Sequence, residues 1–370
     1  MIGSKQTRLA VLMAVASVGV GLTVHWLYAK SVNRIAQVTD QEAASIAKDA
    51  YVYGYPLVTT KITGLVFVNT AKPNPRTFQA PINQFVSMPE YPPATYHGVA
   101  APNADTLYSG AFLDLSAEPM VLSYPDMGKR SFLFPILDAW TNVIHSAGSR
   151  TSGQTGQNLL IAGPSWHGSV PRNMTLVQSP TNTAIIIGRV YSDGTPTDLA
   201  QVHALQAQFK LTPLSSYGEP YTPPPGQTRG AYTPKKIVRD VIAKMSASEY
   251  FNFMAEAMKE NPPIMPQDGQ IVTRMAKIGI VPGEPFDMSQ LSTGNQHAIE
   301  KVPRAVNAQF ASMKAPGLGK TVNHWEIPGN TRRYGTDYLN RALVSAFGWV
   351  GNLPEDAVYP ITKVDSQGIR

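Results

Sequence analysis

The 370-residue sequence contains no cysteine. It can therefore form no disulfide, and it has no thiolate for nucleophilic catalysis or for a cysteine-ligated zinc or iron–sulfur site. Charged residues are also scarce, at 15% of the chain against 43% for hydrophobic residues. A disordered chain has the opposite balance, so most of this chain can bury a core.

Proline and glycine are abundant instead, with 31 and 29 residues. They follow no Gly-X-Y period, which excludes a collagen-like fibre. So many chain-breaking residues favour short elements joined by turns over a helical bundle.

The net charge is +6, but the basic residues are scattered. Lys235-Lys236 and Arg332-Arg333 are the densest pairs, and no stripe interleaves basic with aromatic residues. We therefore expect a solvated basic surface and no nucleic-acid partner.

Residues 9–28 form an apolar run, LAVLMAVASVGVGLTVHWLY. As a helix it would span about 30 Å, the thickness of a bilayer core. Trp26 and Tyr28 stand at its far end, where membrane helices carry interfacial aromatics. The run is long for a cleavable signal, and Leu27-Tyr28-Ala29 is a poor cleavage site. An uncleaved single-pass anchor in the inner membrane, with the body in the periplasm, is favoured over a cleaved signal or a buried helix.

The order of predicted helices and strands in the rest of the chain is typical of an α+β protein. A capping box at Thr39–Glu42 predicts a helix that should end at Pro56. Between Tyr108 and Tyr191, short apolar runs alternate with turn residues, as in AFLDL, MVLSY, SFLFPIL, NLLIAG and AIIIGRVY. No helix-length segment separates them, which indicates an antiparallel jelly-roll-like module and argues against a doubly wound fold.

Helices are predicted for most of the remaining chain. Thr195-Pro196 begins one helix, and Ser246 to Glu249 forms the capping box of another. The predicted organisation has four parts: a membrane anchor or signal segment over 1–38, a β-rich module over 39–211, a Pro/Gly linker over 212–234, and a helical region over 235–370.

The sequence does not match the common motifs for catalysis or for cofactor binding. Gly319-Lys320-Thr321 lacks the upstream glycine of a phosphate loop, and Gly163 to Gly168 is one residue too long for a nucleophile elbow. The histidines nowhere approach metal-ligand spacing. The sequence therefore predicts no metal site and no cofactor.

Polar residues gather instead in the β-rich module. The cluster consists of Asn103, Asp105, Tyr108, Asp138, Trp140, Asn142, Arg150 and Arg189. Each residue alone has a structural explanation, as an Asx turn or a buried ion pair. Together they supply carboxylates, amides, a phenol, an indole and two guanidiniums, which suits a pocket for a small polar or anionic ligand.

In a catalytic site, Asp105 would be the general acid/base, Tyr108 the proton donor, and Arg150 the group that neutralises an anionic substrate. The ligand-binding residues would be Asn103, Asp138, Trp140, Asn142 and Arg189. If Asp105 pairs with Arg150, its lowered pKa restricts it to orientation.

A second polar cluster, Tyr334 to Arg341, lies near the last predicted helix, 334–347. Asp337 and Arg341 are four residues apart, so they would share a helix face and form an ion pair.

Several of these motifs resemble a bacterial family defined by a domain of unknown function numbered 1254. The resemblance is carried by Ala50–Pro56, Pro102–Tyr108, Leu137–Asn142, Arg150–Gly153 and Ile187–Arg189. Tyr334–Arg341 and Pro354–Tyr359 resemble the connector into its usual partner domain, numbered 1214.

This resemblance implies two β-barrel or jelly-roll modules bridged by helices, often in exported proteins, and no settled reaction. Members of the family continue well beyond the position of Tyr359, so residues 235–370 would lead into a truncated second module. Residues 357–370 would then form an extended, poorly packed tail.

Two functions stay open. The first is an exported, membrane-anchored hydrolase or lyase acting on a small polar or anionic substrate. The second is a non-catalytic envelope protein with a ligand-binding or structural role. Convergence of Asp105, Tyr108 and Arg150 in a closed pocket would favour the enzyme, and separate structural pairs would favour binding. The predicted partners are such a ligand, the membrane, and a second copy or a separate chain that supplies the missing module.

Overall fold

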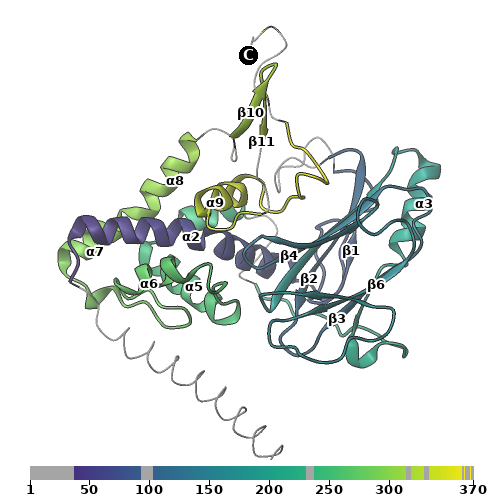
Figure 1. Ribbon diagram of the computed structural model, residues 1–370, viewed down its shortest axis with the longest axis horizontal. Coiled ribbons are helices and arrows are strands. Elements are labelled where there is room, and N and C mark those ends of the chain that lie inside the picture. The colour runs from purple at the N-terminus through teal and green to yellow at the C-terminus, as the bar shows by residue number, and fades with distance from the viewer. Residues whose placement is uncertain are drawn as a thin grey trace, which may run out of the picture.

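The computed structural model describes residues 37–92, 103–230, 237–313, 318–328 and 333–360, together with 362 and 367. In these residues all the helices except α3 (Pro196–Gln206) gather on one side and the two larger β-sheets lie on the other (Figure 1). This is the expected α+β class. The predicted anchor, 9–28, lies outside the described residues, and no helix within them is both long and apolar enough to cross a bilayer.

The helices are α2 (Asp40–Phe67), α3 (Pro196–Gln206), α4 (Val238–Ala243), α5 (Ala247–Glu260), α6 (Gly269–Ala276), α7 (Thr293–Glu300), α8 (Val302–Ser312) and α9 (Tyr338–Phe347). The strands are β1 (Val86–Ser87), β2 (Thr106–Asp114), β3 (Met120–Tyr124), β4 (Phe132–Asp138), β5 (Val143–Gly148), β6 (Gln157–Ala162), β7 (Thr175–Gln178), β8 (Thr183–Tyr191), β9 (Lys210–Pro213), β10 (Leu318–Val322) and β11 (Trp325–Pro328).

Helix α2 is the centre of the helical side. Thr39 caps it by accepting the Glu42 N–H at 3.1 Å, as the capping box predicts. The prediction that Pro56 ends this helix is wrong, because the helix continues to Phe67. Every residue from 51 to 60 is buried, and α2 packs against α4 to α9. This packing compensates for the one backbone hydrogen bond that proline cannot donate. Helix α2 thus shares one hydrophobic core with the helices that follow the sandwich.

The strands form two main sheets, one five-stranded in the order β1-β2-β8-β4-β5 and one four-stranded in the order β7-β6-β3-β9. They pack face to face around a shared core that includes Leu107, Phe134 and Ile186 from the first sheet and Leu122 and Ile161 from the second. The described strands close no barrel. All pairs in the five-stranded sheet are antiparallel, as predicted.

The pair β6–β7 is parallel, which the antiparallel prediction did not include. A parallel pair needs a long crossover, and residues 163–174 supply it.

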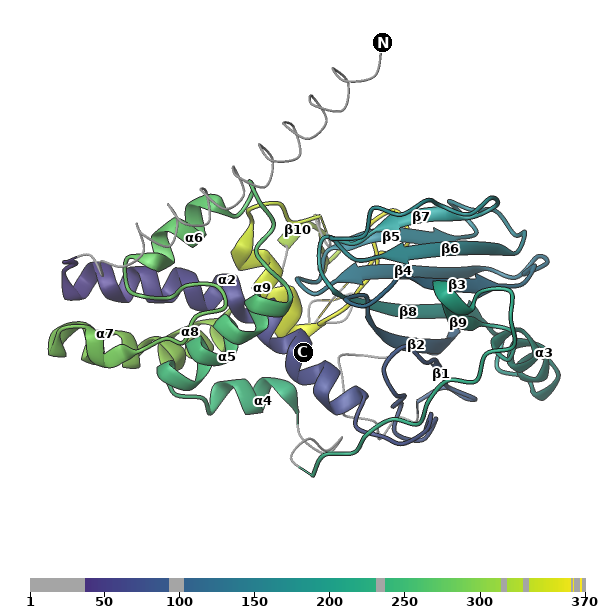
Figure 2. The same ribbon diagram turned by 90° about the horizontal axis from the view of Figure 1, so that it is seen from below.

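The outer face of the five-stranded sheet carries a second apolar layer that includes Phe112, Leu137 and Ile185. Phe67, at the end of α2, and Trp349, just after α9, cover this layer. In Figure 2 the yellow chain after α9 runs from the helices towards this sheet. Beyond it, residues 357–360 form no strand, and the side chains of Val358 and Tyr359 are exposed.

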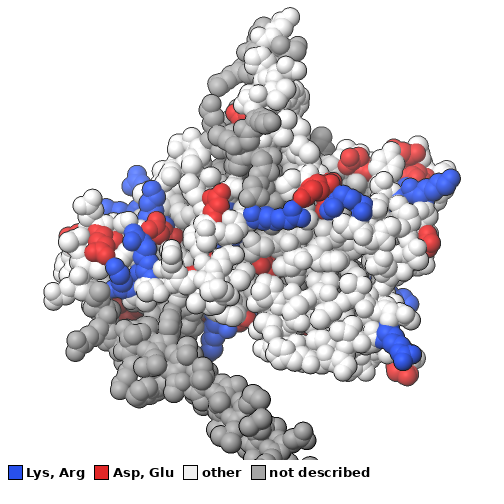
Figure 3. Space-filling view, viewed as in Figure 1, with Lys and Arg blue, Asp and Glu red and all other residues white. Residues whose placement is uncertain are grey.

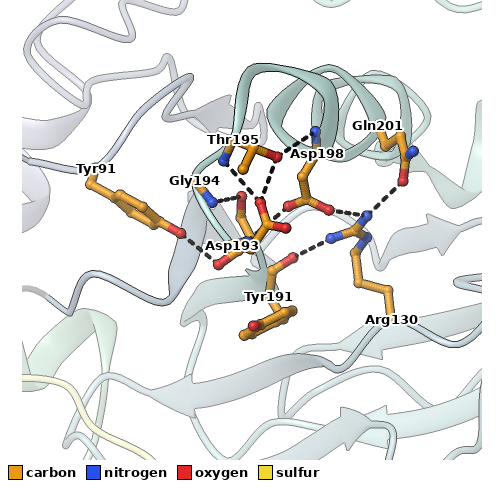
Figure 4. A network of polar contacts seen from close by, with 9 residues as sticks. Tyr91, Arg130, Tyr191, Asp193, Gly194, Thr195, Asp198 and Gln201 are labelled. Atoms are coloured by element: carbon orange, nitrogen blue, oxygen red, sulfur yellow. Dashed lines mark hydrogen bonds and ion pairs between the residues drawn. The ribbon is translucent and has the colours of Figure 1, made fainter.

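Helix α3 is fastened to the sandwich by the polar network of Figure 4. Thr195 caps the helix, and its N–H donates to the Asp193 carboxylate at 2.8 Å. Asp198 forms an ion pair with Arg130 at 2.7 Å. Tyr91 donates a hydrogen bond to the Ser192 carbonyl at 2.6 Å. All these groups are paired with one another, so the network is structural.

Candidate functional site

The structure does not gather the predicted site residues at one point. Asp105 lies just before β2 with its side chain exposed. Its carboxylate makes no hydrogen bond or ion pair with any described residue, although its carbonyl accepts the Ser192 N–H at 3.0 Å. It therefore has no partner that would orient it as a general acid or base.

Asn103, Tyr108 and Arg189 lie together at the outer face of the five-stranded sheet. Tyr108 on β2 stands opposite Arg189 on β8, and the guanidinium carbon lies 5.3 Å from the phenol ring centroid. Arg189 also donates to Asn352 Oδ1 at 2.6 Å. Asn103 Oδ1 accepts the N–H and the hydroxyl of Thr106, both at 3.0 Å. Each of these three residues already has a hydrogen-bond partner within the protein.

Arg150 has a partner other than Asp105. Its Nε lies 2.6 Å from Asp356 Oδ1, and the second oxygen of Asp356 accepts the Ser146 hydroxyl at 2.6 Å. Tyr108 and Arg150 thus enter separate contacts, with Arg189 and with Asp356, and neither contact includes the Asp105 carboxylate.

Asp138, Trp140 and Asn142 form a third group, at the end of β4. The buried Asp138 carboxylate accepts three hydrogen bonds of 2.9 Å, from the Trp140 N–H, the Asn142 N–H and the Asn142 amide. Burial nevertheless raises the pKa of Asp138 to about 6. Thr141 in the same loop has a φ of 69°, which is strained for a β-branched residue.

Next to this group lies Arg341 of α9, which the sequence analysis did not count as a site residue. Its side chain is 0% exposed. Its three nitrogens have no hydrogen-bond partner among the described residues. The predicted ion pair with Asp337 is wrong: Asp337 is the N-cap of α9, and its carboxylate accepts the Asn340 N–H at 3.2 Å.

Three aromatic rings surround the Arg341 guanidinium. Its central carbon lies 5.5 Å from the Tyr53 centroid, 5.3 Å from Trp140 and 5.2 Å from Tyr338. The two phenols donate to Asp268, at 2.9 Å from Tyr53 and 3.0 Å from Tyr338. Burial, followed by the charge of Asp268, raises the pKa of both phenols well above the usual value, so they remain donors.

We call this cluster the buried arginine site. It consists of Tyr53, Asp138, Trp140, Asp268, Tyr338 and Arg341. The residues come from α2, the end of β4 and the loop after it, the start of α6, and α9. The site therefore lies at the junction between the helices and the sandwich.

The chemistry of the site follows from its unpaired cation. Removing a guanidinium from water without pairing it costs several kcal/mol. The aromatic faces recover about 2 kcal/mol. The positive charge also lowers the pKa of Asp138, although burial outweighs it. A guanidinium presents its N–H groups in a fork that matches a carboxylate. The guanidinium thus has N–H groups with which an anionic group could pair.

A signal for Arg341 was present in the sequence. A single arginine stands within LNRALVSAF, an otherwise apolar stretch of the last helix. Tyr53 and Asp268 had no comparable signal, because their roles arise from contacts between distant segments. Among the described residues, no group of His, Asp and Glu side chains could hold a metal ion.

The face of the molecule shown in Figure 3 has no large patch of purely basic or purely acidic residues that would suggest another binding site. On the face shown, basic and acidic side chains alternate over the sandwich and the helices. This agrees with the scattered charge of the sequence.

Two comparisons with known proteins found a match, one over the sandwich and one over most of the chain. A family model, the protein of unknown function DUF1254, matches residues 82–213. The crystal structure of the VPA0106 protein from Vibrio parahaemolyticus is similar with a TM-score of 0.56 and 23% identity, covering 84% of this chain and 69% of that chain. At this identity the likeness shows a shared fold alone. No curated protein matches the chain. The chain is thus similar to the DUF1254 family over its sandwich, whereas Tyr53, Asp268 and Arg341 lie outside the matched residues.

Proposed function

We propose that the protein binds a small anionic ligand at the buried arginine site, without catalysing a reaction on it. One observation carries this proposal: the Arg341 guanidinium is fully buried and has no hydrogen-bond partner among the described residues. A bound carboxylate would accept from the guanidinium and remove the cost of the unpaired charge.

The contacts of the predicted catalytic residues support binding over catalysis. Arg150 is neutralised by Asp356, and the exposed Asp105 carboxylate pairs with none of the described residues. A hydrolase or lyase acting on a small polar substrate is the second candidate, favoured by the raised pKa of Asp138. The Asp138 oxygens already accept three hydrogen bonds from their own loop, which suits a positioning role.

The remaining expectations belong to the same proposal. We place the protein at the inner membrane with its body in the periplasm, held by an anchor over residues 9–28. A jelly-roll arrangement of the sandwich, a companion domain like that numbered 1214, and a second copy or separate chain as partner stay predictions.

Thermal unfolding with added salts tests the binding proposal. Sodium acetate, malonate and phosphate at matched ionic strength are the probes. A ligand that binds only the folded state raises the unfolding temperature as its concentration rises. We expect at least one anion to do so for the wild type, and Arg341→Met to abolish the shift.

The matched control is Arg239→Met. Arg239 also lies over an aromatic ring, 5.8 Å from the Phe347 centroid, but its side chain is exposed. It should retain the full shift. The absence of any shift in the wild type, or an equal shift in Arg341→Met, would contradict the proposal.

A further inference from the structure

Residues 349–359 lie on the outer face of the five-stranded sheet without forming a strand. We call this segment the strap. Trp349 stacks on Phe112 with 5.8 Å between centroids and 11° between planes. Farther along, the backbone turns on itself, since the N–H groups of Asp356 and Ala357 both donate to the Leu353 carbonyl. The contacts that fix the strap to the sheet are made by its side chains.

Two of these contacts are polar and are made to arginines of the sheet side. Asn352 accepts from Arg189 at 2.6 Å. Asp356 accepts from Arg150 and from the Ser146 hydroxyl, both at 2.6 Å. The Asp356 side chain is only 2% exposed, although Arg150 is 45% exposed. The buried Asp356 carboxylate is thus bound by the Arg150 guanidinium and the Ser146 hydroxyl. Together these two groups form a carboxylate-binding site that the strap occupies.

The strap begins at a strained residue. Trp349 has a φ of 40°, in the left-handed region that bulky side chains avoid. Such a conformation costs about 1–3 kcal/mol and persists only where the surroundings hold it. At the other end, Val358 is 58% exposed and Tyr359 39% exposed. Strain at one end and exposure at the other make the strap easier to displace than a paired strand.

We propose that the outer face of the five-stranded sheet is a docking site for an acidic segment of a partner protein, and that the strap occupies it within the same chain. The partner segment would carry an aromatic residue, an amide and a carboxylate at the spacing of Trp349, Asn352 and Asp356. Charge complementarity supports this occupant, because Arg150 and Arg189 face the acid and the amide of the strap. The proposal is independent of the buried arginine site.

A fluorescent peptide with the sequence of residues 349–360, WVGNLPEDAVYP, is the probe for this site. In the wild type it must compete with the strap. Asp356→Asn keeps the shape of the side chain but removes its charge, which should weaken the strap's hold on Ser146 and Arg150. We expect this full-length variant to bind the peptide at least tenfold more tightly than the wild type, as measured by fluorescence anisotropy.

Two controls isolate the carboxylate. A peptide with asparagine at the position of Asp356 should bind Asp356→Asn at least tenfold more weakly, and adding Arg150→Met should weaken the original peptide equally. Equal binding by wild type and Asp356→Asn, or equal binding of the two peptides, would overturn the proposal. So would dimerisation of Asp356→Asn where the wild type is monomeric, because a second copy would then be the occupant.

Discussion

At the scale of single residues, Arg341 is a charge that the fold buries without pairing. Its neighbours Tyr53 and Tyr338 direct their hydroxyls to Asp268 instead of accepting from the guanidinium. Asp138 is likewise engaged with its own loop. A cluster that leaves one cation unsatisfied is less stable than it could be, which is typical of sites kept for binding.

The free-energy cost of burying an unpaired guanidinium leads to a prediction for the stability of Arg341→Met in the absence of ligand. Replacing buried charges by apolar side chains of similar volume is often neutral or stabilising by about 1–4 kcal/mol. We expect the variant to unfold at a higher denaturant concentration than the wild type. The exposed Arg239→Met should stay within about 0.5 kcal/mol of the wild type. A destabilised Arg341→Met would show that the guanidinium is satisfied in the unliganded protein.

The raised pKa of Asp138 predicts that the free energy of unfolding depends on pH. Its pKa is about 6 in the folded chain and about 3.9 in an unfolded one. The folded state therefore binds the proton more tightly, so the group contributes stability below about pH 4 and loses that contribution as the pH rises through about 6. The loss amounts to on the order of 3 kcal/mol, at about 1.4 kcal/mol per pKa unit.

Asp138→Asn removes this titration while keeping an oxygen for the Trp140 and Asn142 N–H groups. Urea unfolding of both proteins between pH 4 and pH 7 is the measurement. The stability of the wild type relative to the variant should fall across this range. His145, whose half-buried ring has a lowered pKa because of desolvation, is present in both proteins, so its contribution cancels in the difference. A constant difference would contradict the assignment.

At the scale of elements, α2 and α5 approach closely at Gly54. A methyl group at this position would overlap Met254 Sδ and lie 2.7 Å from its Cγ. Met254 is fully buried and has little room to move. Gly54→Ala should therefore destabilise the protein by about 1–3 kcal/mol, although alanine is the better helix former by about 1 kcal/mol.

Gly269→Ala, at the start of α6, is the matched control. There the nearest atom, Met265 Cε, would lie 3.4 Å away, an ordinary contact. This variant should be as stable as the wild type or slightly more stable. Chemical denaturation of the two variants compares them directly, and equal effects would show that α2 and α5 are not in close contact at Gly54.

The ion pair between Arg130 and Asp198, which holds α3 on the sandwich, predicts that acid lowers the stability of the fold. The hydrogen bond from Arg130 lowers the pKa of Asp198 to about 2. The pair therefore stabilises the fold above about pH 4, and its contribution is lost as the pH falls towards 2. Because both side chains are partly exposed, we expect about 1 kcal/mol. Asp198→Asn should lose this amount at pH 6 and little at pH 2.5 in urea unfolding, and a loss independent of pH would contradict it.

At the scale of the whole molecule, the apolar run over residues 9–28 predicts membrane attachment. The full-length chain should stay in the membrane pellet after a carbonate wash, because a spanning helix is not removed by high pH. A variant without residues 1–36 should appear in the supernatant. Release of the full-length chain by carbonate would rule out the anchor.

The whole-molecule arrangement also explains why the candidate site was only partly foreseen. Asp138 and Trp140 were recognised as polar and aromatic interruptions of a strand. Arg341, which lies beside them, comes from a helix some two hundred residues later, and the sequence pattern predicted it to be half of an ion pair with Asp337. Its burial depends on how α9 packs against α2 and the sandwich, and no local pattern encodes that.

The sequence by itself determined what depends on neighbouring residues. The absence of cysteine excluded thiol chemistry, the turn-bounded apolar runs became strands, and Ser246 to Glu249 formed its capping box. These features follow from local backbone preferences and side-chain period.

Only the tertiary structure decided the features that depend on distant contacts. Pro56 lies inside a helix because the surrounding helices stabilise it, and β6–β7 is parallel because a long connection crosses over. Arg150 pairs with Asp356 instead of Asp105, and Arg341 is enclosed by rings from three segments. Such contacts join residues far apart in the chain, so their energies appear only when packing brings those residues together.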